Sequence, residues 1–178
     1  MSDSQPIVIR IKKSADGRSA LSCTRADGTT TWQSLKGNQA AFFPRHDLTH
    51  YAVETVLGHR KGFYGLVAAG WDLPDFGTPW PRGKIPSEAN LTELFVGFFD
   101  RERASGELGT AAELNEHIAN FCAENGFPVG EKCTDEDLAR VRQKRGELFT
   151  LWDAVKPGDA LELPFDPAIL TSASGVPT

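Results

Sequence analysis

Hydrophobic and polar residues alternate along the first third of the chain with the two-residue period of β-strands. Residues 7–12 are rich in β-branched side chains and are followed by the turn dipeptide Asp16-Gly17. Segments 20–24 and 29–33 flank Arg25-Ala26-Asp27-Gly28, where glycine supplies the positive φ that closes a tight hairpin. The pattern predicts a three-stranded antiparallel meander.

After Gly37 the apolar residues recur with the 3.6-residue period of a helix. Phe42-Phe43-Pro44 leads into a stripe that ends at Gly58, which predicts the first helix. Capping-box patterns predict further helix starts at Asn90 and Thr110, and Thr134 begins the last helix. The apolar segment 62–71 fits either a buried helix or an irregular core segment.

The alternating segment 160–165 predicts a fourth strand. We expect it to pair with the meander, because an isolated strand would leave its backbone groups unpaired. The predicted fold class is therefore α+β, with an antiparallel sheet, the three-stranded N-terminal meander plus the C-terminal strand, packed against about four helices. Residues 1–165 are expected to form a single α+β domain, and residues 166–178 a loose C-terminal tail.

Composition limits the location and the partners. No apolar run approaches the ~20 residues that a membrane span needs, and the first residues show no secretory signal, so we expect a cytoplasmic protein. The net charge of -5 argues against nucleic-acid binding. The basic residues at positions 140, 142, 144 and 145 are interpreted as a solvated helix face. Three separated cysteines predict buried thiols: Cys23, Cys122 and Cys133.

The segment 45–54 concentrates the candidate chemistry, since it holds two of the four histidines and two carboxylates. If Pro44 takes the first helical position, His46 and His50 share one helix face. If Asp47 is the N-cap, they do not. We prefer the first arrangement, in which the two histidines offer a ligand pair for one divalent transition-metal ion.

The spacing of this motif is similar to two families. His46-Asp47-Leu48-Thr49-His50 is similar to the H-E-x-x-H pattern of the zincins, with Asp47, one methylene shorter, where that family places its general-base glutamate. The His46-Asp47 dipeptide also resembles HD-type phosphohydrolases. Those need an additional upstream histidine, and His46 is the first histidine of this chain.

A metal site needs a third ligand. His117 would complete a three-histidine site if its helix packs against the first, and His59 is the other candidate. Glu54 lies about 12 Å along the helix from His46, so we expect it to orient His50 instead. In a hydrolase, Asp47 or Glu54 would move the proton.

Residues 72–83 form a long connector with three prolines and two glycines. Trp71 and Trp80 are expected to wall a pocket for a small molecule, with Asp75 and Arg82 as polar groups. The alternative is that the aromatic rings only cover a satellite hydrophobic cluster.

Three functional hypotheses remain open. The first is a metal-dependent hydrolase of a small molecule. The second is a non-enzymatic ligand-binding or protein-interaction module, which would present Tyr51, Trp80 and Arg82 and could be a homo-oligomer. In the third, His46 and His50 only satisfy polar groups at a helix start. The sequence alone favours a structural role for the histidines.

Overall fold

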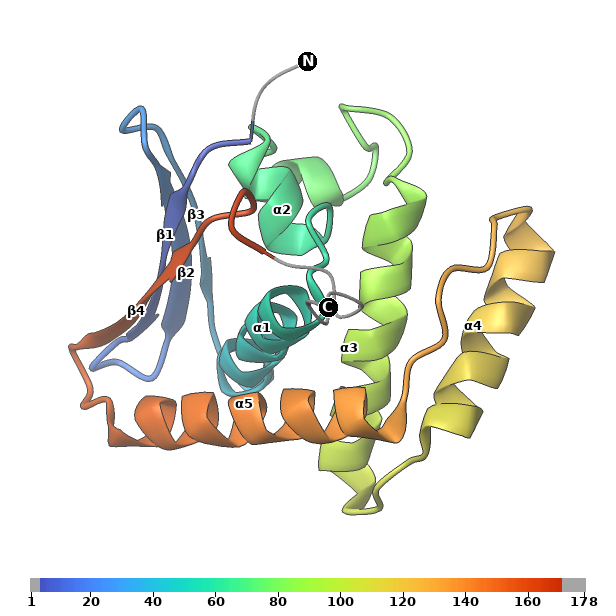
Figure 1. Cartoon of the computed structure of the whole chain (residues 1–178). Coiled ribbons are helices and arrows are strands. Elements are labelled where there is room, and N and C mark those ends of the chain that lie inside the picture. The colour runs from blue at the N-terminus through green and yellow to red at the C-terminus, as the bar shows by residue number, and fades with distance from the viewer. Residues whose placement is uncertain (1–3, 171–178) are drawn as a thin grey trace.

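The computed structural model describes residues 4–170. Its strands form one antiparallel sheet in the order β3-β2-β1-β4, with the helices on one side (Figure 1). The predicted meander and the fourth strand are confirmed, and β4 pairs with β1. The strands are β1 (Ile7–Lys13), β2 (Ser19–Arg25), β3 (Thr30–Leu35) and β4 (Ala160–Phe165).

The two-residue period makes one face of the sheet part of the core. Ile9 is fully buried, whereas Val8 beside it is 46% exposed. Ile9 is paired with Cys23 on one side and with Leu163 on the other, so buried side chains continue across the strands. The helices pack on this apolar face.

Three of the other helices pack against the helix that follows the meander. In the described part of the chain the helices are α1 (Asn38–Leu57), α2 (Phe63–Ala68), α3 (Ser87–Ser105), α4 (Ala111–Asn125) and α5 (Asp135–Ala154), with a short 3-10 turn, η1, at Leu73–Phe76. α1 lies between the sheet and α3, and α4 stands outside α3 (Figure 1).

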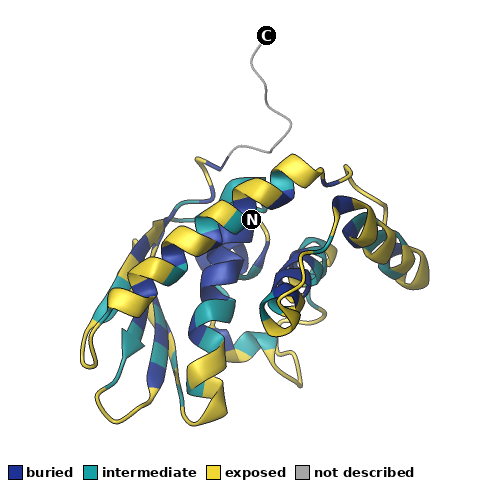
Figure 2. Ribbon diagram, turned by 90° about the horizontal axis from the view of Figure 1, so that it is seen from below, coloured by how far each residue is buried: buried dark blue, intermediate teal, exposed yellow. Residues whose placement is uncertain are grey.

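α1 is the central element, because it contacts α2, α3, α5 and β2. Every residue from Asp47 to Glu54 is buried. Figure 2 shows buried residues gathered at the centre of the molecule and exposed residues on the outer sides of the long helices. Polar side chains on an enclosed helix must find partners inside the protein, since burial without a partner is costly.

The helix that carries the histidines begins earlier than predicted. α1 starts at Asn38, so Pro44 lies inside it and not at its first position. Both histidines are nevertheless within the helix, as we preferred, and it ends at Gly58 as predicted. The undecided segment 62–71 contains the short helix α2.

Of the three other predicted helix starts, one is wrong and two are confirmed. The predicted start at Asn90 is wrong, because α3 begins at Ser87. The Asn90 side chain instead donates a hydrogen bond to the carbonyl oxygen of Ile85 (3.2 Å). The capping box at Thr110 and the helix start at Thr134 are confirmed, and the structure adds a capping box at Thr134.

The interpretation of the basic residues of α5 as a solvated face is wrong at Arg145, which is buried. Its Nη2 donates to the carbonyl oxygen of Phe99 (3.1 Å), and its Nε donates to Oγ1 of Thr49 (3.2 Å). Its guanidinium also lies over the rings of Phe99 and Phe149. Arg145 therefore ties α5 to both α1 and α3.

Other sequence expectations have mixed outcomes. The three cysteines are free and buried, as predicted. Among residues 4–170, none of the helices combines the length and the apolar composition that a membrane span needs.

Leu170 is buried, and its carbonyl oxygen accepts hydrogen bonds from Arg60. Residues 171–178 lie outside the described range, and the proposed boundary between domain and tail stays a prediction.

His59, just beyond α1, should make the fold sensitive to acid. Thr92 donates its hydroxyl proton to the carbonyl oxygen of Glu88, so Nδ1 of His59, 2.9 Å away, is the donor to Thr92 Oγ1. Burial lowers the pKa of His59 from 6.5 to about 4. The stability that the neutral ring supports is therefore complete above pH 6.5 and is lost as the pH falls through about 4.

Wild type should lose unfolding free energy between pH 7 and pH 4, and we expect this loss to be about 3 kcal/mol smaller in His59→Asn, which keeps a donor for Thr92. Urea unfolding at both pH values measures this difference. Equal losses in the two proteins would show that His59 does not carry the acid sensitivity.

Candidate metal centre

Packing of α1 against α3 brings three potential metal ligands together. His46 and His50 lie one turn apart on α1, and Glu93 lies on α3; one ligand atom of each is within 4.8 Å of the other two. The centroids of the two imidazole rings are 4.9 Å apart. His46 and His50 thus share a face, and the third member of the group is a carboxylate from α3.

His50 is buried between two carboxylates. Its Nε2 lies 3.2 Å from Oε1 of Glu93, and its Nδ1 lies 3.5 Å from Oε1 of Glu54. Burial lowers the pKa of His50, but the two glutamates outweigh burial and raise it to about 10. Nδ1 makes no well-aligned hydrogen bond. The ring is therefore positioned by charge more than by hydrogen-bond geometry.

Glu54 joins His50 to the start of α2. Its side chain is fully buried, and its two oxygens accept hydrogen bonds from the backbone N–H groups of Tyr64 (3.1 Å) and Gly65 (3.0 Å). Burial raises the pKa of Glu54, while His50 and the two N–H groups act in the opposite direction. With both oxygens occupied in this way, Glu54 is placed to orient His50.

His46 has a carboxylate partner of its own on α3. Its Nδ1 lies 2.6 Å from Oδ2 of Asp100, and Nη2 of Arg103 donates to the other oxygen of Asp100 (3.2 Å). Burial disfavours the charge on Asp100, but His46 and Arg103 lower its pKa. The ring of Phe42 stacks on His46, with a centroid distance of 5.4 Å. Since Nδ1 is engaged, Nε2 is the nitrogen of His46 that remains for an ion.

Asp47 is near the group but is not one of its three ligands. Burial raises its pKa to about 7, although His46 and His50 act to lower it. Its carboxyl is close enough to Cys23 of β2 and Tyr64 of α2 to help burial raise the pKa of both. The charge on Asp47 thus acts on the histidines and also on residues of β2 and α2.

The aromatic residues predicted as pocket walls are only partly connected to this group. Trp71 packs on Phe76 (5.4 Å between ring centroids), and Phe76 packs on Phe63 (4.7 Å), which contacts His50 (5.2 Å). Trp80 is 45% exposed. A continuous line of rings therefore joins Trp71 to His50.

The remaining predicted ligand-binding residues make contacts within the protein. Nε of Arg82 lies 2.6 Å from Oδ2 of Asp75, and its Nη2 donates to the carbonyl oxygen of Gly70 (2.6 Å). The hydroxyl of Tyr51 donates to the carbonyl oxygen of Pro164 on β4 (2.8 Å). The structure thus pairs Asp75 with Arg82 and directs Tyr51 toward the sheet.

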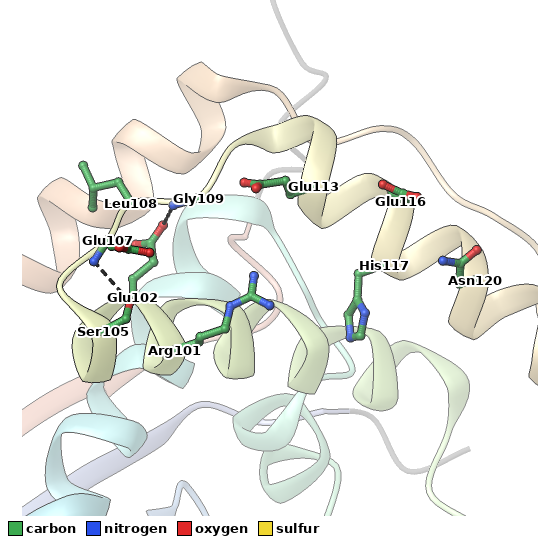
Figure 3. Close-up of a pocket in the computed structure, with 10 residues that line it drawn as sticks. All are labelled: Arg101, Glu102, Ser105, Glu107, Leu108, Gly109, Glu113, Glu116, His117 and Asn120. Atoms are coloured by element: carbon green, nitrogen blue, oxygen red, sulfur yellow. Dashed lines mark hydrogen bonds between the residues drawn. The ribbon is translucent and has the colours of Figure 1, made fainter.

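His117 lies apart from His46 and His50. It is on α4 and lines a cavity of about 450 Å³ between α3 and α4. Figure 3 shows its ring and the side chain of Arg101 from α3 entering the same space. One acid on this wall, Glu113, is engaged by the N–H of Thr110 (2.7 Å). His117 is therefore in a different place from the three-residue group.

Sequence reasoning missed Glu93 and Asp100. The predicted capping box uses the Glu93 carboxylate at a helix start, but with α3 beginning at Ser87 this residue is inside the helix. Glu93 and Asp100 are seven residues apart, so they lie on one face of α3. The sequence did contain one signal for them: two acids at this spacing on a predicted amphipathic helix, in a chain with a histidine pair on another helix.

Gly62 leaves the space that Glu54 occupies. A Cβ atom on Gly62 would lie 2.5 Å from Cδ of Glu54, whose carboxylate is held in place by two N–H groups. We expect Gly62→Ala to lower the free energy of unfolding by about 2 kcal/mol and to shift the NMR signals of the His50 ring. Gly97→Ala is the control, because a Cβ there meets no atom within 4 Å. Equal stability of the two variants would contradict this role of Gly62.

The arrangement can hold an ion with nitrogen and oxygen ligands, and each histidine ring has a carboxylate beside its other nitrogen. Such outer carboxylates fix the ring orientation in metal sites. No protein-family model, curated protein or solved structure matches this chain, so a function can be inferred only from its own residues.

Proposed function

We propose that this protein is a metal-dependent hydrolase of a small molecule, with a divalent transition-metal ion held by His46, His50 and Glu93. One observation carries the proposal: the ligand atoms of these three side chains converge within 4.8 Å. Two imidazoles and one carboxylate suit Zn²⁺ and other first-row ions. Three protein ligands also leave a position for water.

The separation of two of the ligands supports this assignment. Nε2 of His50 and Oε1 of Glu93 are 3.2 Å apart. Two ligands that each lie about 2.1 Å from zinc at a tetrahedral angle are about 3.4 Å apart. An ion would therefore need little movement of these two side chains.

The charges nearby also favour a cation. Three carboxylates surround the histidines, those of Glu54, Glu93 and Asp100, and Arg103 neutralises only Asp100. An ion that replaces the proton on Nε2 of His50 would take over its partner Glu93, while Glu54 would stay beside Nδ1. The site is thus suited to exchange a proton for a metal ion.

The ion would supply the reactive water. Bound zinc lowers the pKa of water to about 7, which gives a hydroxide that can attack a carbonyl or phosphoryl centre. The Glu93 side chain is 50% exposed and His50 only 2%, so one side of the ion would face solvent. Since Glu54 is engaged at α2, Asp47 is the proposed proton acceptor of the two predicted from sequence.

A second candidate function is favoured by the contacts of His50 itself. A charged ring between Glu54 and Glu93 is a paired buried group that needs no ion. In that case the histidines are structural, and the protein is a non-enzymatic ligand-binding or protein-interaction module. The two candidates differ in whether transition metal binds at all.

Elemental analysis of protein made without a histidine tag separates them. We expect near-stoichiometric transition metal in wild type, and at least about tenfold weaker metal affinity in Glu93→Gln. His117→Ala is the control and should keep the ion, because His117 lines the cavity between α3 and α4 and is not part of the three-residue group. Metal-loaded wild type should hydrolyse p-nitrophenyl esters or phosphates, and chelated protein should not.

If wild type binds no ion after exposure to zinc, iron, manganese, nickel and cobalt, the hydrolase proposal fails and the structural candidate stands. Metal binding without hydrolysis of either substrate would support the metal site and contradict the proposed hydrolase activity. Equal metal affinity in Glu93→Gln and wild type would place the ion elsewhere.

Asp100→Asn tests the outer carboxylate. The amide cannot supply the negative charge beside Nδ1 of His46, so we expect metal affinity to fall by about 10–100-fold. Asp153→Asn is the matched control, because it makes the same chemical change in the ion pair with Arg45 at the surface. Competition with a chromogenic chelator measures both affinities. Equal losses in the two variants would rule out a specific role for Asp100.

A further inference from the structure

β3 is an edge of the sheet and lacks the features that keep edge strands from pairing. Its sequence, Thr-Thr-Trp-Gln-Ser-Leu, has no charged residue and no proline. Within residues 4–170, no hydrogen bond outside the sheet uses the backbone groups of this strand, although the Thr31 side chain accepts one from the N–H of Leu73 in η1 (2.9 Å). The opposite edge, β4, carries Glu162 and Pro164. The outer backbone groups of β3 are thus available to another strand.

Trp32, in the middle of β3, is 66% exposed, more than any other aromatic residue that the structure describes. It alternates with the buried Thr31, so it stands on the face of the sheet away from the helices. Its neighbours on this face are small: Thr30 and Ser34 along the strand, and Ser22 opposite it on β2. These short side chains leave room for a second large ring.

The helical layer also covers this end of the sheet incompletely. Gln33 and Leu35 are on the face toward the helices, yet both are only half-buried. At the centre of the sheet, Ile9 and Leu21 on the same face are buried. An added strand would extend the sheet and enclose this end.

We propose that two copies of this chain associate by antiparallel pairing of their β3 strands, with Trp32 opposite Trp32 of the second copy. The two strands would be related by a twofold axis that passes between the two Trp32 residues, perpendicular to the sheet. The faces that point away from the helices in the two copies would then form one continuous surface. Two uncharged strands bring no like charges into register, and aromatic residues opposite each other stabilise antiparallel pairs. The same register puts Thr30 opposite Ser34. The association does not depend on a metal ion.

Sedimentation velocity over a range of protein concentrations tests the association. We expect a monomer–dimer equilibrium in wild type and a dissociation constant at least about tenfold higher in Trp32→Lys, which places two like charges opposite each other. Trp80→Lys is the control, since it alters the other exposed tryptophan. Circular dichroism would show whether each variant is folded.

Cross-linking tests the register without relying on the lysine variant. Cysteines introduced by Trp32→Cys would face each other across the interface, within disulfide reach, and should form a covalent dimer under mild oxidation. Ser34→Cys is the control: it lies on the same face of the same strand, but opposite Thr30. It should not cross-link alone, and it should cross-link when mixed with Thr30→Cys.

A wild type that is monomeric at every concentration would overturn the proposal, and would leave the edge open to a strand of another protein. A dimer that is unaffected by Trp32→Lys, or that cross-links equally through positions 32 and 34, would place the interface elsewhere.

Discussion

The enclosure of α1 is the constraint on which the rest of the structure depends. Eight consecutive residues of this helix, from Asp47 to Glu54, are buried, and two of them are carboxylic acids. A buried carboxylate is tolerated only with partners, because it has lost its water. Glu54 finds them in the N–H groups at the start of α2 and in His50. The position of α2 and the need for glycine at residue 62 both follow from that requirement.

Stability alone does not explain this network. A buried set of charges is on average no more stabilising than apolar residues of the same volume, since desolvation offsets the attraction between the charges. An apolar side chain at position 47 would also have avoided the cost of burying a carboxyl group. That cost is seen in the pKa of Asp47, which burial raises to about 7. The physical balance therefore favours a use for these groups beyond holding α1 in place.

The parts of the fold that sequence predicts are those determined by local chemistry. Strand alternation fixed the buried face around Ile9, and the capping boxes at Thr110 and Thr134 start their helices through side chains three residues apart. The site required contacts between residues more than 40 positions apart, such as Glu93 with His50. Periodicity does not report which helix faces which. For the same reason the burial of Arg145 within a run of charges was not predictable.

The packing around the two histidines also limits how a substrate could reach an ion. On the α2 side of His50, the rings of Phe63, Phe76 and Trp71 form a continuous packed series, so this direction is filled by side chains. On the other side, His46 lies beneath Phe42, which is 39% exposed and carries the guanidinium of Arg103 over its ring. The half-exposed Glu93 borders the same histidines. If the proposed ion binds, a small substrate would therefore have to approach it between α1 and α3, past the ring of Phe42.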